Sequence, residues 1–243
     1  MKEVVQYIIL SIVVLLISTY LIGAAVWFST RPKQMVCSGI EWKIQDSLER
    51  QYITVDELTT LINRTNLNPE GKEANAVLTQ AIETCVQGHP MVKRAQCFVT
   101  NRGQVRVKLI QRVPVLGVRT DGCSYYIDED HLRMPTSARI TTPVIWAVGK
   151  IDETLAKTVL TDMVEWLKGD AYWEDRIERM EVKSNQYIVL VDTSGLRIIV
   201  GDGQQFESRM NKLRVFEEQM KRVGGKTYKE LDLRYKDQVI GRE

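Results

Sequence analysis

The sequence predicts an α+β protein with one N-terminal transmembrane helix, a β-α-α-β-β segment, and a mixed, mostly antiparallel β region with two helices. Residues 4–28 form an uncharged run rich in Ile, Leu and Val. After residue 40, runs with a period of two residues alternate with runs of helical spacing. Turn residues separate these runs at short intervals. The 243 residues leave enough chain after the first helix for one or two domains with real cores.

The run at 4–28 is long enough to span a bilayer, which takes about 20 apolar residues. Tyr7 and Trp27 are separated by roughly 30 Å along a helix, so both can act as anchors at the two membrane–water interfaces. A cleavable signal peptide has a shorter apolar core and a small-residue cleavage site. This run instead ends in bulky Val26-Trp27-Phe28, which favours an uncleaved anchor in the lipid bilayer.

The charges flanking this helix do not settle its orientation. Lys2 lies in a three-residue tail, 1–3, and Arg31 and Lys33 lie in a linker, 29–35. Because positive residues concentrate on the cytoplasmic side, this count weakly favours a cytoplasmic C-terminal region. The orientation is left open at this point.

Composition gives no sign of a nucleic-acid partner. The net charge of +2 is spread along the chain, with no basic block and no interleaved aromatic residues. The cysteines match no zinc motif. They allow one or two disulfides in an oxidising compartment, with three pairings if all engage, and free thiols are an equal alternative. They are Cys37, Cys85, Cys97 and Cys123.

The β-α-α-β-β segment follows the linker. Alternation at 40–44 predicts a strand, and Thr54 with Glu57 forms a capping-box pattern that starts a helix. A second helix is expected from Ala74 to Val86, where GHP at 88–90 stops it. Strands at 93–100 and 104–111 are joined by an Asn-Arg-Gly turn, which predicts a hairpin.

Beyond Pro114 the pattern is mostly strands. They are expected at 115–119, 124–127, near 131–134, 143–148, 176–183, 186–192 and 195–200. Helices are expected at about 153–168 and 204–222, each with apolar residues at three-to-four spacing. LDLRY at 231–235 alternates strictly and predicts a half-exposed last strand.

The chain has no enzyme motif, and we expect no catalytic residue, cofactor or metal centre. Its two histidines, His89 and His131, belong to no catalytic or metal-binding pattern. Residues 128–130, Asp-Glu-Asp, are able to bind a cation, although such acidic turns are more often simply solvated.

Six short motifs follow one another along the chain: ITVDEL at 53–58, HPMV at 89–92, QRVPV at 111–115, YYID at 125–128, TPVI at 142–145 with Gly149, and LDLRY at 231–235. In this order they resemble the motifs of the FtsQ/DivIB family of bacterial cell-division proteins. The chain departs from the family at Met91, where an aromatic residue is usual, and at His131, where glycine is common. Its three-residue tail is also shorter than in many relatives.

The resemblance implies a POTRA-like domain at 36–113 and an FtsQ-type β domain at 114–243 that ends in an edge strand. It implies a non-enzymatic divisome scaffold at the septum, which binds FtsB and FtsL in the periplasm and helps control septal peptidoglycan synthesis. The POTRA-like domain implies other divisome membrane partners. The LRYKDQV run is similar to versions from the Bacteroidetes group, which implies a Gram-negative inner membrane with the N-terminus in the cytoplasm.

The resemblance places the FtsB contact at residues 229–240, because an exposed edge strand accepts a partner strand. Charges at 230, 232, 234 and 236 are expected on its exposed side, and Tyr235 takes the family position beside the partner strand. The alternative is that this strand only closes its own sheet. The predicted contact residues are Glu230, Asp232, Arg234, Tyr235, Lys236, Asp237, Gln238, Val239 and Ile240.

Two other functions compete with this reading. POTRA domains also occur in components of outer-membrane protein assembly or secretion, but those usually carry tandem repeats and a long β-barrel. The roughly 130 residues after the predicted POTRA-like domain are too few for a large barrel. A membrane-tethered cell-wall hydrolase needs a nucleophile or metal cluster that the sequence does not show.

Overall fold

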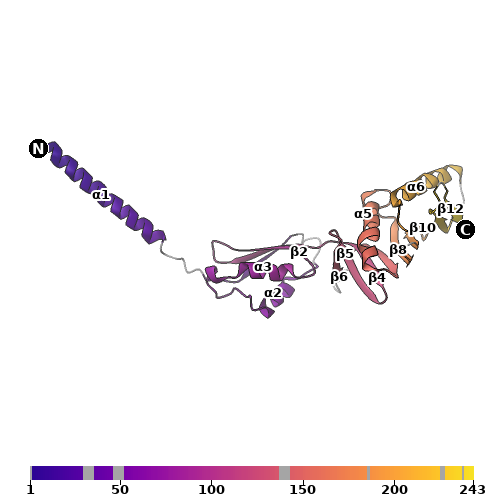
Figure 1. The fold of residues 1–243 in the computed structure, drawn as a ribbon, viewed down its shortest axis with the longest axis horizontal. Helices are drawn as coiled ribbons and strands as arrows, with labels where there is room; N and C mark the ends of the chain where they lie inside the picture. The colour runs from indigo at the N-terminus through magenta and orange to yellow at the C-terminus, as the bar shows by residue number, and fades with distance from the viewer. Residues whose placement is uncertain are drawn as a thin grey trace.

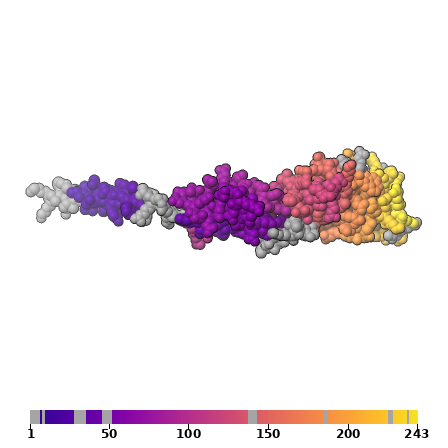
Figure 2. All heavy atoms as spheres, turned by 90° about the horizontal axis from the view of Figure 1, so that it is seen from below, coloured from indigo at the N-terminus to yellow at the C-terminus, as the bar shows by residue number. Residues whose placement is uncertain are grey.

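The computed structural model describes residues 2–29, 36–45, 52–136, 143–184, 187–224, 228–236 and 238–243. An N-terminal helix and two domains follow one another along the longest axis of the molecule (Figure 1). In Figure 2 the last residues of the chain, in yellow, form the end of the molecule opposite that helix. Asp237 and most of the predicted linker lie outside the described residues.

Helix α1 (Lys2–Ser29) contains the predicted span. Its window Leu10–Trp27 has a mean hydropathy of 2.2 and contains no buried residue, and it is the one candidate span among the described residues. The Ser11 hydroxyl donates to the Tyr7 carbonyl at 2.9 Å, and Thr19 bonds in the same way to Leu15. These hydroxyls are therefore satisfied within the helix, as an apolar environment requires. The helix fits a single-pass membrane anchor, with Tyr7 and Trp27 exposed near its two ends.

The first domain has the predicted β-α-α-β-β order. It comprises β1 (Ile40–Gln45), α2 (Val55–Arg64), α3 (Thr79–Gln87), β2 (Val92–Val99) and β3 (Val105–Gln111). The sheet order is β1-β3-β2, with β1 parallel and β2 antiparallel to β3. The capping box is confirmed: the Glu57 amide donates to Thr54 Oγ1 at 3.3 Å, and the Thr54 amide donates to Glu57 Oε2 at 3.1 Å.

The second helix starts later than predicted. Ala74–Ala76 forms a separate 3-10 turn, and Val77 has an extended backbone with φ −74° and ψ 124°. An extended residue cannot continue the helical hydrogen-bond ladder, so α3 begins only at Thr79. Ile82 and Val86 of α3 are buried as expected.

The second domain is one nine-stranded mixed sheet, in the order β12-β11-β10-β9-β8-β7-β4-β5-β6. Most of its strand pairs are antiparallel, as predicted. The predicted helix 153–168 consists of α4 (Glu153–Leu155), a π-helical turn (Ala156–Leu160) and α5 (Thr161–Gly169). The last helix is α6 (Phe206–Val223). The strands are β4 (Pro114–Thr120), β5 (Cys123–Asp128), β6 (Arg133–Pro135), β7 (Ile145–Gly149), β8 (Ile177–Ser184), β9 (Tyr187–Asp192), β10 (Arg197–Gly201), β11 (Glu230–Asp232) and β12 (Ile240–Arg242).

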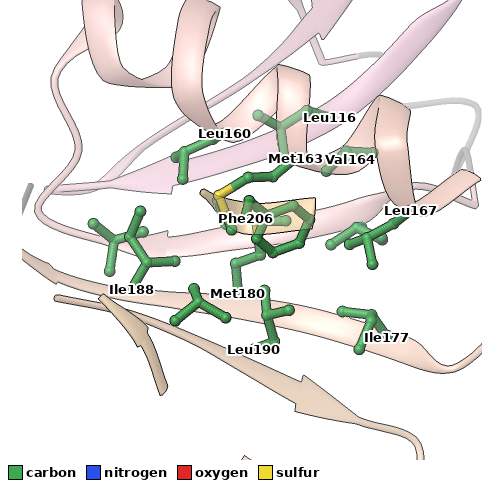
Figure 3. Packing of buried hydrophobic residues seen from close by; sticks show 14 of the residues in the cluster. Leu116, Leu160, Met163, Val164, Leu167, Ile177, Met180, Ile188, Leu190 and Phe206 are labelled. Carbon is green, nitrogen blue, oxygen red and sulfur yellow. The ribbon is translucent and has the colours of Figure 1, made fainter. Parts of the chain in front are cut away.

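The core of this domain lies between the sheet and its helices. Figure 3 shows Leu160, Met163 and Leu167 pointing toward Met180 and Leu190 of the sheet. These side chains are almost fully excluded from solvent. Burying an aliphatic side chain of this size contributes roughly 1.5–3 kcal/mol. Apolar side chains at three-to-four spacing on the helix thus pack against apolar side chains at alternate positions of the strands.

Apolar packing between the two domains depends on a tryptophan that lies over a glycine. Gly117 in β4 pairs with Trp146 in β7, and a Cβ at Gly117 would lie 2.6 Å from the Trp146 ring. The indole therefore lies directly over the glycine, where it contacts the Tyr126 ring at 5.5 Å between centroids. Tyr126, Met134 and Trp146 pack into the same apolar cluster as the first domain's core.

All four cysteines are free thiols in the structure. Cys37 is buried, Cys85 and Cys97 are half-buried, and Cys123 is exposed. Burial, with a smaller contribution from Glu83, raises the pKa of Cys97 to about 11. This thiol therefore stays protonated at neutral pH and is a poor nucleophile.

Candidate partner-binding edge of the C-terminal sheet

The C-terminal sheet ends in strand β12 (Ile240–Arg242). Strand β11 pairs in parallel with β10 and antiparallel with β12, with Leu231 opposite Gly241. All three residues of β12 are exposed, and the outer side of an edge strand carries backbone groups without strand partners. The domain therefore ends in an edge strand, at the end of the molecule away from α1 (Figure 1).

The single strand expected within 229–240 is wrong in its extent. The structure divides it into β11 and β12, and the described residues between them, 233–236 and 238–239, belong to neither strand. Tyr235 and Lys236 form a bend and are exposed, Gln238 is exposed, and Val239 packs against the domain core. Ile240 begins β12, so the exposed edge lies after most of the predicted contact residues rather than along them.

Lys212 of α6 explains why the chain bends here. Its Nζ donates to the carbonyl oxygens of Leu233 at 3.3 Å and Gln238 at 3.3 Å. The carbonyls of Tyr235 and, at 3.4 Å, Lys236 also lie within hydrogen-bond reach, so the four oxygens share its three N–H donors. Carbonyls that converge on one ammonium group cannot also point sideways along a strand, so residues 233–236 and 238 curl around it. We call residues 233–236 and 238 the Lys212 turn.

Asp232 was predicted to be exposed, and this prediction is wrong. Its side chain is nearly buried, and Arg234 Nη2 and Nε donate to its carboxylate at 2.6 and 2.9 Å. Burial acts to raise the pKa of Asp232, but the hydrogen bonds and charge of Arg234 outweigh it and lower the pKa. The predicted alternation holds on the inward side, where Leu231 and Leu233 are buried. On the outward side, the Arg234 side chain folds back over Asp232.

A row of alternating charges crosses the outer face of the sheet toward β12. Glu181 lies between Arg179 at 3.3 Å and Arg197 at 2.8 Å. Arg197 also reaches Glu230 at 3.6 Å, and Glu230 binds Arg242 at 2.8 Å. The row ends on Arg242, whose side chain is 66% exposed. The row of ion pairs therefore ends on a positive charge, and the exposed Glu243 follows it in the chain.

Two large apolar side chains are exposed in this segment, Tyr235 in the Lys212 turn and Ile240 in β12 itself. Tyr235 is 49% exposed and Ile240 is 37% exposed, although both are large hydrophobic residues. A glycine is required at position 241, because a Cβ there would lie 2.4 Å from the Tyr228 ring. This end of the sheet thus offers the free backbone edge of β12, two exposed apolar side chains and the guanidinium group of Arg242.

Lys212, Gly241 and Arg242 were not predicted as part of the site. A three-residue strand is too short to show a period, so no pattern marked β12. Lys212 lies on the polar side of an amphipathic helix, where lysines are usually solvated. The pairing of Arg242 with Glu230 becomes visible only once the strand register is known.

The acidic turn at 128–130 pairs with basic residues of the first domain. Arg112 Nη1 donates to Asp128 at 2.6 Å, and Lys93 Nζ contacts Glu129 at 2.5 Å and Asp130 at 3.0 Å. Hydrogen bonds and the negative charges of Glu129 and Asp130 raise the pKa of Lys93. The turn therefore joins the two domains.

Two family models match consecutive parts of the chain. A family model described as FtsQ/DivIB, C-terminal related, matches residues 113–242. A model of a POTRA-like domain matches residues 35–110. A search of curated proteins found no match. The gap between the two matched regions coincides with the junction between β3 and β4.

Proposed function

This chain belongs to the FtsQ/DivIB family, and on that premise we propose that it is a membrane-anchored divisome scaffold that binds FtsB at strand β12. The family is one of non-enzymatic cell-division scaffolds. In this proposal FtsB brings FtsL, and the complex helps control septal peptidoglycan synthesis. The POTRA-like domain binds other divisome membrane proteins.

The observation that carries the proposal is the exposed edge strand β12, which includes the exposed Ile240, together with the exposed Tyr235 of the Lys212 turn. A partner strand adds main-chain hydrogen bonds along such an edge, and neighbouring side chains give it specificity. Covering the Tyr235 and Ile240 side chains would add apolar contact area to those main-chain hydrogen bonds. A three-residue edge is short, so we expect the Lys212 turn to contribute to the contact as well.

The charge row favours an acidic partner segment. Arg242 ends the row at the edge, and Lys236 is exposed in the Lys212 turn. A partner carboxylate opposite Arg242 would continue the alternation that crosses the sheet. A partner segment with a positive charge opposite Arg242 would be repelled, and a second copy of the same edge is such a partner.

Co-purification from native membranes tests the proposed contact. We expect Tyr235→Ala and Lys236→Glu each to reduce the amount of FtsB recovered with the full-length chain. Val215→Ala is the matched control, because Val215 is also a large exposed apolar residue but lies on α6. Equal recovery of FtsB with all three folded variants would exclude Tyr235 and Lys236 from the contact.

Orientation and cellular role have separate tests. We propose that the N-terminus is cytoplasmic and that both domains lie in the periplasm, at the septum of a Gram-negative inner membrane. A reporter that works only in the periplasm should be active when it is fused after Glu243. A reporter that works only in the cytoplasm should be inactive at the same position. Depletion of the protein should give filamentous cells if it acts in division, whereas outer-membrane defects without filaments would favour a role in outer-membrane assembly.

A further inference from the structure

We propose that His131, Asp162 and Glu165 form a binding site for Zn²⁺ between the β5–β6 turn and helix α5. One ligand atom from each of the three side chains lies within 4.8 Å of the other two. The site is separate from the β12 edge and from the domain core. Its residues come from two segments, so a bound ion would join the turn to the helix.

The turn holds the His131 ring in one tautomer. His131 has a left-handed backbone, with φ 58°, and its Nδ1 lies 2.5 Å from the Lys157 carbonyl oxygen in the π-helical turn. A carbonyl only accepts hydrogen bonds, so the proton of the neutral ring is on Nδ1. Nε2 therefore presents its lone pair. A backbone carbonyl bonded to the other ring nitrogen is the usual outer-shell support of a metal-binding histidine.

The two carboxylates lie where an ion bound to Nε2 would need them. Asp162 and Glu165 are three residues apart, so they share one face of α5. Glu165 Oε1 is 3.6 Å from His131 Nε2. Donors around a tetrahedral Zn²⁺ with bonds of about 2.0–2.2 Å lie roughly 3.4 Å apart. That pair already has this spacing, and the exposed Asp162 side chain can rotate to complete the set.

The donor set selects the kind of ion. One imidazole nitrogen and two carboxylate oxygens suit Zn²⁺, whereas Mg²⁺ and Ca²⁺ prefer oxygen ligands alone. A dication would also offset the two nearby carboxylate charges. No lysine or arginine among the described residues forms an ion pair with Asp162. Three protein ligands leave a fourth position for water.

The site would stiffen the junction between the domains. Within three residues of His131, Asp128 binds Arg112, and Glu129 and Asp130 bind Lys93 of the first domain. The same turn would then be tied to the first domain by ion pairs and to α5 by the metal. We expect Zn²⁺ to slow amide exchange in residues 128–132.

Calorimetric titration of the full-length, detergent-solubilised chain with ZnCl₂ tests the site. We expect one Zn²⁺ per chain, with affinity reduced roughly ten- to a hundredfold or more in His131→Asn, since loss of even an outer-shell partner has that effect. Asparagine tolerates the left-handed backbone at 131, so this variant keeps the turn. Asp162→Asn and Glu165→Gln should also weaken binding, and both are surface changes that leave the fold intact.

Matched controls separate this site from adventitious binding. His89→Asn removes the other histidine, and Cys123→Ser removes the exposed thiol. Both should leave Zn²⁺ affinity unchanged, and MgCl₂ should not compete. Zn²⁺ should also shift the ¹⁵N signal of His131 Nε2 but not the signals of His89. Absence of Zn²⁺ binding, binding that survives His131→Asn, Asp162→Asn and Glu165→Gln, or binding lost in Cys123→Ser would overturn the proposal.

Discussion

Arg112 and Asp128 form an ion pair across the junction of the two domains, with Nη1 of Arg112 2.6 Å from Oδ2 of Asp128. Asp128 is completely buried, and its Oδ1 accepts hydrogen bonds from the amides of Asp130 at 3.0 Å and Leu132 at 2.7 Å. Arg112 directly follows β3, and Asp128 ends β5. One carboxylate thus fixes both the connection between the domains and the turn that carries His131.

Removing this carboxylate should destabilise the junction strongly. We expect Asp128→Ala to lower the free energy of unfolding by about 3–5 kcal/mol, because it leaves Arg112 without its partner in a partly buried site. Urea unfolding followed by tryptophan fluorescence measures this loss. Glu129→Ala in the same turn removes only an exposed ion pair and is the control. Equal effects of the two substitutions would contradict the assigned role of Asp128.

Gly117 should resist any side chain while Trp146 is present. We expect Gly117→Ala to cost roughly 1–3 kcal/mol, the usual cost of overpacking a core. In a Trp146→Leu background the same change should cost less, because the clashing ring is gone. Thermal unfolding of the single and double variants gives the coupling. Gly169→Ala is the control, since a Cβ there meets nothing within 4 Å; additive effects at 117 and 146 would argue against the contact.

The first domain should lose stability in mild acid through His89. Burial lowers the pKa of His89 from its ordinary 6.5, and Glu57 only partly opposes this. The ring is neutral in the fold and accepts a hydrogen bond from the Met91 amide at 3.2 Å. Because the unfolded chain binds this proton more readily, stability is full above about pH 6.5 and falls below it.

Melting temperatures at pH 7.5 and pH 5.0 measure this loss. His89→Asn keeps an acceptor for the Met91 amide but cannot titrate, so its melting temperature should fall less between these two values. His131→Asn is the control and should retain the His89 contribution. The His89 assignment fails if His89→Asn loses as much stability in acid as the unmodified chain.

Lys212 should hold the partner-binding region in shape. We expect Lys212→Met to speed amide exchange in the Lys212 turn and in β12 by roughly tenfold or more, because a hydrogen bond to a charged group contributes about 1.5–3 kcal/mol. Recovery of FtsB should fall in parallel. Lys221→Met, at an exposed position on the same helix, is the control. Unchanged exchange in Lys212→Met would show that the turn does not depend on this lysine.

Elements with long patterns could be predicted from the sequence. Three predicted features depend on a local signal within a short stretch of sequence, and the structure contains all of them. They are the capping box at Thr54, the β2–β3 hairpin and α6. Their form depends on neighbours in the sequence, so sequence patterns are sufficient.

The C-terminal edge could not be predicted in the same way. LDLRY has the alternation of one strand, but Lys212, which lies 23 residues before Tyr235, bends the chain after β11. Asp232 has the spacing of an exposed residue and is covered by Arg234. Both outcomes depend on contacts between residues that only the fold brings together. The packing of Trp146 over Gly117 was missed for the same reason.

Photocrosslinking from β12 in living cells tests the proposed FtsB contact most directly. A photoreactive amino acid is placed at position 240 or 242 of the full-length chain, or at position 215 on α6 as the control. The account predicts a crosslinked adduct with FtsB from 240 and 242, and none from 215. An FtsB adduct from 215 but not from β12, or no FtsB adduct from any position, would contradict strand addition at this edge.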